Sequence, residues 1–315
     1  ITGNTSWDCT GVICTLDATE DVVNEAIEKK CNLIVAHHPI VFKGLKKING
    51  KNYVEKAIIA AIKNDIAIYA IHTNLDNVKQ GVNGRIAQML ELENCKILSE
   101  KDGTLNKLFT FVPVDHAAKV RNAIFAAGGG QISNYSECSF NAEGVGTFKV
   151  GKGTNPFVGE PGKHQQEKEI KIEIIFPTYL ERKIMAALIA AHPYEEVAYD
   201  IIQLSNSNQT IGSGMIGELP NPVEEKQFLK NLMELFRVPV VRHTRFTGRP
   251  VKKVAVCGGA GSFLISKALA AEADVYITAD VKYHEFFDAN DRLLIADVGH
   301  YESEQFTINL LQEVL

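Results

Sequence analysis

Residues 32–39 read NLIVAHHP, and they decide the fold that the sequence predicts. Leu33–Ala36 is a short apolar run of the kind that forms a buried strand. His37 and His38 follow that strand directly, and Pro39 fixes the turn after them. In α/β proteins, ligands collect at the carboxyl ends of strands. A single histidine in this place is more often a satisfied core or loop residue, whereas two adjacent histidines can diverge toward two different metal ions.

Strand and helix patterns alternate on both sides of this stretch, which indicates an α/β core with a mixed, mostly parallel sheet and helices on both faces. Thr19 is the expected N-cap of the first helix. The chain before residue 105 predicts strands at Gly11–Asp17 and Ile66–His72, and helices at Thr19–Lys30, Tyr53–Asn64 and Val82–Leu90. After residue 210 it predicts strands at Val251–Cys257, Val275–Ala279 and Leu293–Asp297, and helices at Phe263–Ala271 and from Ser303 to Val314.

The middle of the chain has a different order of elements. It predicts strands or strand-like pieces at Lys107–Pro113, Gln131–Tyr135, Glu137–Asn141, Gly144–Val150, Glu169–Phe176 and Ala198–Leu204, helices at His116–Ala127 and Tyr179–Ala191, and a loop at Gly151–Gln166. This βαβ–βαβ arrangement suits a ferredoxin-like α+β module. We therefore expect an α/β core built from residues 1–104 and 206–315, with an inserted domain at 105–205.

Length and charge limit the classes of function. At 315 residues, two domains are the natural expectation. A formal net charge of -5 argues against nucleic acid as a partner, because a nucleic-acid binder usually carries a basic stripe. The stretch Lys43–Lys56 is rich in lysine but short, and we interpret it as a solvated loop and helix face.

The cysteines and the apolar runs of the sequence indicate in which cellular compartment the protein is expected. The six cysteines form no CxxC pair, which predicts reduced structural thiols rather than a disulfide framework. No apolar run approaches the length of a transmembrane helix, so no membrane partner is expected. The first residue is Ile1 rather than Met, which leaves a removed targeting segment open. We expect a cytoplasmic protein.

Two further segments carry metal-ligand chemistry at predicted strand ends. Asp76 follows the strand that ends near His72, although a carboxylate in that place is also common as a helix N-cap. We interpret His72 as a structural residue or a support for ligands. His300 and Glu304 follow another strand, and their spacing of four puts them on one face if a helix has begun. The alternative is a strand-to-helix turn in which Glu304 favours the helix N-terminus electrostatically.

Taken together, the three segments predict one buried site for two divalent metal ions. Three imidazoles and two carboxylates suit Zn, Mn, Fe, Co or Ni. Five ligands cannot close two sites unless a carboxylate bridges, so open positions for water would remain, as in catalytic sites. Two ions about 3.5–4 Å apart lower the pKa of a bridging water and can clamp a substrate oxygen. The expected ligands are His37, His38, Asp76, His300 and Glu304.

The remaining candidates are weaker. The loop Gly258–Ser262 precedes a predicted helix and could bind an anion through its backbone N–H groups, but a plain tight turn explains it equally well. Asp280 and His284 follow the next strand and could line the same pocket behind the ligands. No side chain is singled out as catalytic, since a metal-bound water would be the nucleophile.

Three motifs together resemble the GTP cyclohydrolase 1 type 2 homologue family, also called the Nif-three-like family. The resemblance covers nearly the whole chain. It rests on Asn32–Pro39 (NLIVAHHP), Ile71–Asp76 (IHTNLD) and Asp297–Glu304 (DVGHYESE), and continues through Cys257–Ser262 (CGGAGS) and Asp274–Glu285 (DVYITADVKYHE). The segment His192–Asp200 (HPYEEVAYD) is similar to the PII/CutA-like insert of longer bacterial members.

The resemblance implies a role for each ligand. It implies that His38 and Asp76 bind one ion, that His37 and His300 bind the other, and that Glu304 bridges both. It also implies a toroidal homohexamer. The chain departs from the family pattern at its start, where an N-terminal helix is absent or reduced to Ser6–Cys9, and at Met215, where many members have Arg.

Two classes of function follow. The first is a metal-dependent hydrolase, GTP cyclohydrolase-like, that acts on a nucleotide or related small molecule. The second is a non-enzymatic metal-binding oligomer that serves as a scaffold, metallochaperone or regulatory interaction protein. The sequence names neither the substrate nor the native metal.

Overall fold

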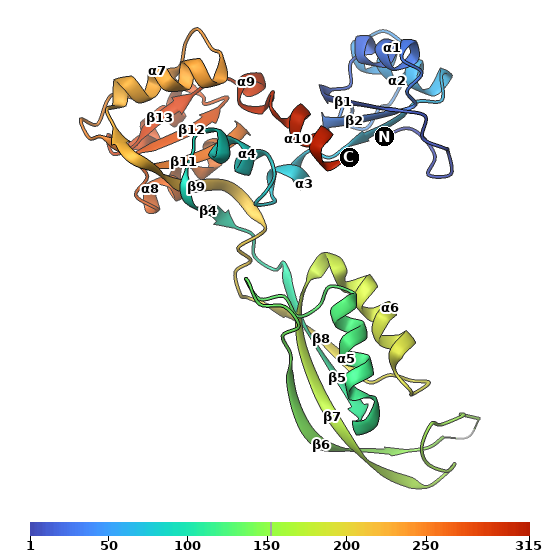
Figure 1. Ribbon diagram of the computed structural model, residues 1–315. Coiled ribbons are helices and arrows are strands. Elements are labelled where there is room, and N and C mark those ends of the chain that lie inside the picture. The colour runs from blue at the N-terminus through green and yellow to red at the C-terminus, as the bar shows by residue number, and fades with distance from the viewer. Residues whose placement is uncertain (152) are drawn as a thin grey trace. The chain divides into compact units, whose positions relative to one another are not determined.

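The computed structural model describes residues 1–151 and 153–315, which fall into two compact units. One unit combines Ile1–Glu100 with Thr210–Leu315, and the other is Lys101–Gln209 (Figure 1). Helices and strands each account for 32% of the chain, which confirms the predicted mixed α/β class. Among the described residues, no helix is long and apolar enough to cross a membrane.

The larger unit contains a three-stranded parallel sheet that carries the first histidines. Its strands are β1 (Val12–Asp17), β2 (Leu33–His38) and β3 (Ala67–Ala70), in the order β1-β2-β3. The helices α1 (Glu20–Glu28) and α2 (Tyr53–Lys63) bury Val23, Ala26, Ala57 and Ile58 against Ile34, Ala36 and Ile68. Strand β2 continues through His38, and Thr19 lies at the N-cap of α1 without a side-chain hydrogen bond.

A second, six-stranded sheet lies in the same unit. Its order is β10 (Arg242–His243), β13 (Leu294–Asp297), β12 (Val275–Ala279), β11 (Val251–Ala260), β9 (Gly212–Val223) and β4 (Glu93–Glu100). Only β11, β12 and β13 pair in parallel, and β10, β9 and β4 pair antiparallel. The sheet is mixed as expected, but it is not mostly parallel, because the antiparallel strands β4, β9 and β10 were not predicted.

Helices cover both faces of the six-stranded sheet. On one face, α4 (Val82–Met89) and α7 (Glu225–Phe236) contribute Ile86, Phe228 and Leu232 to a core with Val254, Val256 and Ile277. On the other, α8 (Ile265–Ala270) packs against Ala255, Tyr276 and Ile295. The expected last helix is two helices, α9 (His300–Glu304) and α10 (Thr307–Val314).

The smaller unit has the element order β-α-β-β-α-β. Its elements are β5 (Leu105–Pro113), α5 (Ala117–Ala126), β6 (Phe140–Lys149), β7 (His164–Pro177), α6 (Glu181–Ala191) and β8 (Tyr199–Leu204). The strands form an antiparallel sheet in the order β6-β7-β5-β8. Of the three strand-like pieces expected between 131 and 150, the first contains only an isolated bridge between Ile132 and Tyr135, and the others give way to β6. Strand β7 begins inside the expected loop.

The buried side chain of Glu225 contributes to the stability of the larger unit. Its side chain is 5% exposed and accepts hydrogen bonds from the N–H and hydroxyl groups of Thr247 and the N–H of Gly248, at 2.8–3.0 Å. We predict that Glu225→Ala lowers the free energy of unfolding by about 2–3 kcal/mol in urea denaturation, because buried donors lose their partner. Glu234→Ala, at an exposed position of the same helix, should change it by less than about 0.5 kcal/mol. Equal effects of both substitutions would contradict this interpretation.

Candidate metal centre

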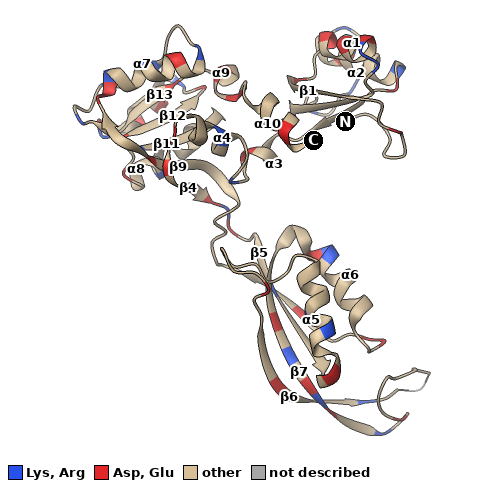
Figure 2. Cartoon of the chain, in the orientation of Figure 1, with Lys and Arg blue, Asp and Glu red and all other residues tan. Residues whose placement is uncertain are grey.

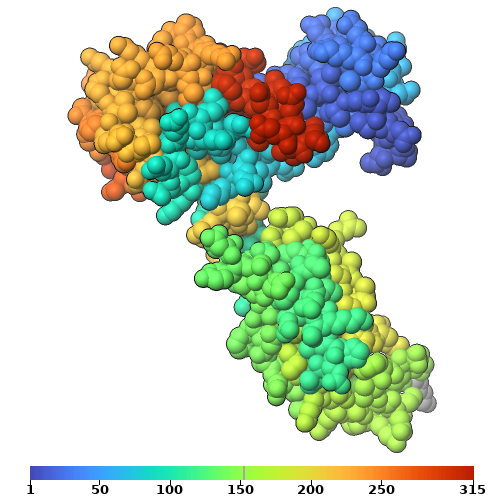
Figure 3. Space-filling model, viewed as in Figure 1, coloured from blue at the N-terminus to red at the C-terminus, as the bar shows by residue number. Residues whose placement is uncertain are grey.

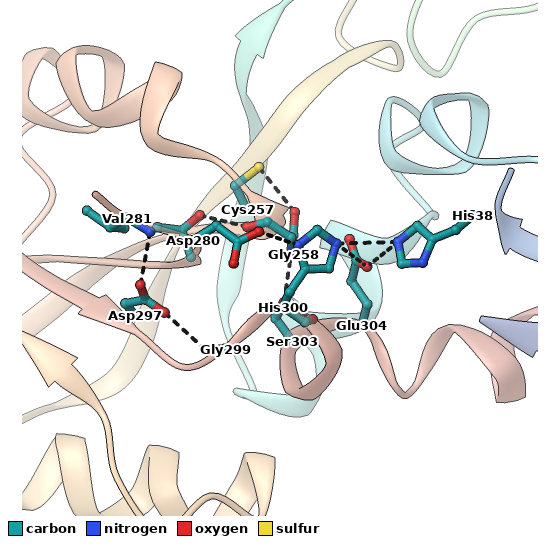
Figure 4. A network of polar contacts seen from close by, with 12 residues as sticks. His38, Cys257, Gly258, Asp280, Val281, Asp297, Gly299, His300, Ser303 and Glu304 are labelled. Atoms are coloured by element: carbon teal, nitrogen blue, oxygen red, sulfur yellow. Dashed lines mark hydrogen bonds and ion pairs between the residues drawn. The ribbon is translucent and has the colours of Figure 1, made fainter. Parts of the chain in front are cut away.

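All five predicted ligands converge in the larger unit. His37 and His38 end strand β2, and Asp76 ends the short helix α3 (Thr73–Asp76) that follows β3. His300 and Glu304 begin and end α9, directly after β13. A helix has therefore begun at His300, so the spacing of four does place both side chains on one face. Figure 4 shows that Glu304 lies between His300 and His38.

The carboxylate of Glu304 is shared by three imidazoles. Its Oε2 atom lies 2.9 Å from Nε2 of His38 and 3.2 Å from Nε2 of His300. Its Oε1 atom lies 3.6 Å from Nε2 of His37. Burial alone would raise the pKa of Glu304, but its close contacts with the three imidazoles outweigh burial and hold that pKa well below its usual range. Glu304 is therefore an ionised carboxylate, although it is only 3% exposed.

His37 and Asp76 carry buried polar atoms that lack a hydrogen-bond partner among the described residues. These atoms are both ring nitrogens of His37 and Oδ1 of Asp76, and His37 Nε2 lies 3.5 Å from that oxygen. Burial raises the pKa of Asp76 to about 6. Buried polar atoms without partners are costly and rare in folded proteins, so each calls for an explanation. A metal ion bound to Nε2 of His37 and Oδ1 of Asp76 would give both of these atoms a partner, and His37, His38 and Glu304 each offer a ligand atom within 4.8 Å of the others.

Two further carboxylates hold the rings of His38 and His300 from behind. Nδ1 of His38 lies 3.1 Å from Oδ1 of Asp17, and Nδ1 of His300 lies 2.7 Å from Oδ2 of Asp280. The hydrogen bonds to Glu304 and Asp280 raise the pKa of His300 to about 9 despite its partial burial. Metal-binding histidines almost always engage their second nitrogen in this way, which fixes the tautomer and the ring. The other nitrogen of each ring, Nε2, faces Glu304.

The neighbour relations differ from those that the family resemblance implies. The structure places Asp76 beside His37, whereas His300 lies beside His38 with 3.4 Å between their Nε2 atoms. The implied pairs, His38 with Asp76 and His37 with His300, are not the pairs in contact. The carboxylate of Glu304 contacts His37, His38 and His300, and the division of the five ligands between two ions stays a prediction.

The glycine-rich stretch CGGAGS serves the site through close packing. Strand β11 runs through it to Ala260, and the N–H groups of Gly258 and Gly259 donate to Asn83 and Ser303, both at 2.9 Å. These two N–H groups are occupied within the protein, so neither is available to an anion. Gly259 has φ +65°, and a Cβ atom there would lie 2.4 Å from Oε1 of Glu304. Glycine therefore lets the backbone approach the carboxylate.

Buried polar side chains anchor the segments that carry the ligands. Asn83 is 2% exposed, and its Nδ2 donates to the carbonyl of Asp76 at 3.1 Å. Asp297 accepts hydrogen bonds from the N–H groups of Val281 and Gly299 and pairs with Arg242. These contacts fix the turn into α9, and Figure 4 shows Asp297 beside that turn.

The other predicted residues have mixed outcomes. Asp280 lies against His300 as expected, but His284 is exposed and its ring stacks with Tyr283 and Phe287. His72 lies beyond the end of β3 rather than within a strand, with a φ of +39°. Its ring centroid is 5.7 Å from those of His37 and His38, so it borders the site. Met215 is 1% exposed within the core on β9.

Asp17 is the site residue that sequence reasoning missed. It ends strand β1 and stands opposite His38 in the parallel register of β1 and β2. The available signal was an apolar run ending at a carboxylate, next to the strand that ends in two histidines. The fold and these side chains define an α/β protein with a candidate metal site at strand ends.

Comparisons with known proteins identify the family. The model of the Duf34/NIF3 (NGG1p interacting factor 3) family matches residues 1–315. A "GTP cyclohydrolase 1 type 2 homolog" of Halalkalibacterium halodurans is 44% identical over 291 residues, which are 92% of this chain and 78% of that protein. A protein of the same description from Bacillus subtilis is 41% identical over 292 residues, again 92% and 78%. The chain therefore belongs to the Duf34/NIF3 family.

Solved structures agree. A crystal structure of a Bacillus cereus protein related to NIF3 matches with a TM-score of 0.85 and 41% identity, covering 99% of this chain and 85% of that one. A Staphylococcus aureus protein matches with a TM-score of 0.73 and 28% identity, covering 99% and 84%.

Asp280 provides a test of the centre that leaves the five ligands in place. We predict that Asp280→Asn weakens divalent metal binding by roughly tenfold or more, because His300 loses the carboxylate that orients its ring. Isothermal titration of metal-free protein with Zn²⁺ or Mn²⁺ measures the change. Asp288→Asn, at an exposed position nearby, is the matched control. Equal affinities of the wild type and both variants would show that Asp280 does not orient a metal ligand.

Proposed function

We propose that this protein is a metal-dependent hydrolase with two divalent metal ions per chain. The proposal rests chiefly on the Glu304 carboxylate, which is buried, ionised and shared by three imidazoles. The buried atoms of His37 and Asp76 that lack a hydrogen-bond partner are a second reason, because a bound cation could coordinate them. The proposed ligands are His37, His38, Asp76, His300 and Glu304, and the donor set suits Zn, Mn, Fe, Co or Ni.

The chain's own residues have distinct roles in this proposal. Glu304 holds both ions, and Asp17 and Asp280 keep the rings of His38 and His300 in place from behind. His37, fully buried, fixes the inner end of the site together with Asp76. When bound, the two ions would activate water and polarise an oxygen of the substrate. Five protein ligands leave positions on the ions for both, which is typical of a catalytic centre.

Several lysines beside the site favour an anionic substrate. Residues 42–56 contain five lysines and one acid, Glu55, in a chain whose net charge is -5. This lysine-rich segment starts four residues after His38, and the ring of Phe42 lies 5.8 Å from that of His72. Lys43, Lys46, Lys47 and Lys51 are exposed and form no ion pair with the rest of the described chain.

Backbone hydrogen bonds to Glu55 fix the second half of the lysine-rich segment. The Glu55 carboxylate accepts hydrogen bonds from the N–H groups of Asn49 and Lys51, both at 3.0 Å, and these bonds lower its pKa. Lysines held in this way can attract phosphate groups toward the metal centre. Relatives carry the description "GTP cyclohydrolase 1 type 2 homolog", so GTP is the substrate to test first.

We predict that metal-loaded protein releases formate from GTP, or phosphate from a nucleotide, and that Glu304→Gln abolishes the release. The reason is that the amide keeps the shape of Glu304 but not the charge that holds both ions. Formate and phosphate assays should be run with Zn, Mn, Fe and Ni, and bound metal measured by mass spectrometry. If metal is bound and neither product appears, the hydrolase proposal is wrong.

The family description names an interacting factor, which favours a second candidate, a metal-binding interaction protein. Under that alternative, the variant in which both His37 and His38 are replaced by Ala loses metal binding but still binds its partner protein. Under the hydrolase proposal, the same variant loses product formation in proportion to the metal it loses.

The lysine-rich segment gives an independent prediction. Lys46→Ala with Lys47→Ala should raise KM for an anionic substrate by roughly tenfold with little change in kcat, because these side chains attract the substrate but do not touch the reacting atoms. The matched control replaces two exposed lysines of α7, Lys226 and Lys230, and gives the same net charge. Equal KM values for both double variants would show that overall charge, and not this segment, matters.

Three further proposals rest on the family resemblance. We propose that the chain assembles as a homohexamer, that it is cytoplasmic, and that the unit Lys101–Gln209 is a ferredoxin-like domain of PII/CutA type. The β-α-β-β-α-β order of that unit supports the last of these.

A further inference from the structure

The smaller unit contains a cavity that the proposed hydrolase does not use. It has a volume of about 670 Å³ and lies over the face of the sheet opposite to helices α5 and α6. Those helices pack on Leu108, Ile172 and Ile174, whereas the cavity is lined by residues that alternate with them along the same strands, such as Phe111, Glu169 and Lys171. Residues on one strand that differ by one position point to opposite faces.

One wall of the cavity is aromatic. Phe148 and Phe157 flank Tyr194, with ring centroids 6.3 Å and 6.1 Å from that of Tyr194. Phe111 also lines the cavity. Aromatic faces carry negative electrostatic potential and attract cations that lie within about 6 Å of the ring centre.

A buried carboxylate lies beside this wall. Glu169 is 8% exposed, and its Oε1 atom accepts a hydrogen bond from the hydroxyl of Tyr194 at 2.8 Å. Its Oε2 atom accepts no hydrogen bond from the described part of the chain, and no Lys or Arg in that part pairs with Glu169. Lys171, the next residue after Glu169 on the same face of β7, is paired with Glu173 at 2.8 Å. A largely buried carboxylate with a single hydrogen-bond donor can bind a cationic ligand through its other oxygen.

Neighbouring residues fix the position of the Glu169 side chain. The N–H of Tyr194 donates to Nδ1 of His192 at 3.1 Å, and Nε2 of His192 donates to the carbonyl of Phe111 at 3.0 Å. Burial lowers the pKa of His192, so the neutral ring that this geometry needs is favoured. On the adjacent strand β6, Gly146 leaves space for the carboxylate, since a Cβ atom there would lie 2.1 Å from Oε2. Both arrangements place the carboxylate at the aromatic wall.

We propose that this cavity binds a small organic ammonium ion, with its charge against Glu169 and its carbon atoms against Tyr194, Phe148 and Phe157. The carboxylate supplies the charge complement, and the rings supply both apolar contact and cation–π attraction. An anion would meet Glu169 unfavourably, and a neutral ligand would leave Oε2 unpaired. The site is distinct from the metal centre, whose residues all belong to the other unit.

Titration calorimetry of the full chain tests the proposal with matched probes. Choline is compared with its neutral isostere 3,3-dimethyl-1-butanol, and n-butylammonium with 1-butanol. We expect at least one ammonium ion to bind roughly tenfold or more tightly than its neutral counterpart. Equal binding of charged and neutral probes, or no binding of either ammonium ion at millimolar concentration, overturns the proposal.

Three variants separate the roles of charge and shape. Glu169→Gln removes the charge but keeps an acceptor for Tyr194, and Gly146→Ala displaces the carboxylate without changing any charge. Each should weaken ammonium binding by roughly tenfold, with the melting temperature as a check on folding. Glu137→Gln, at an exposed position of the same unit that does not line the cavity, should leave the affinity unchanged. If Glu169→Gln leaves ammonium affinity unchanged, or alters only the oligomeric mass in light scattering, the cavity is no ammonium site and the proposal fails.

Discussion

The buried carboxylate of Glu304 is the constraint on which the larger unit depends. A charge with 3% exposure can be tolerated only where partners compensate for the lost water. Its partners are three imidazoles, two from strand β2 near the start of the chain and one from α9 near its end. The two ends of the chain must therefore meet at this point. A bound cation would add stability to the same arrangement, because ligands that bind only the folded state favour it by mass action.

The backbone around Glu304 is adapted to that requirement. Gly258 and Gly259 bring strand β11 so close to the carboxylate that side chains larger than hydrogen would collide with Glu304 or with its neighbours. The same two residues donate their N–H groups to Asn83 and Ser303, and Asn83 in turn holds the carbonyl of Asp76. One short stretch of strand thus determines the position of ligands from two other segments, and this close approach explains why glycine occurs at both positions.

Local pattern explains what could be predicted from the sequence and what could not. The apolar run before His37 and the spacing of His300 and Glu304 are local features, and they indicated the segments whose side chains the structure brings together. Strand β9 was missed because Gly212, Gly214 and Gly217 interrupt its alternation, and β4 because it is largely polar. The contacts between ligands depend on the directions of side chains that come from distant segments. The pairing of Asp17 with His38 depends on the parallel register of β1 and β2. Neither is encoded in spacing along the chain.

The two units satisfy buried charge by different means, and this difference separates the ligands that each can hold. At the metal centre, several nitrogen and oxygen atoms converge within a few ångströms, and His37 and Asp76 keep atoms that no proton donor of the described chain reaches. A metal ion suits such a cluster, because it can coordinate several nitrogen and oxygen atoms at once. At Glu169 a single oxygen is left beside aromatic rings, which is too few donors for a metal site. A monovalent cation with an apolar body fits that surrounding, because one end needs a carboxylate and the rest needs apolar contact.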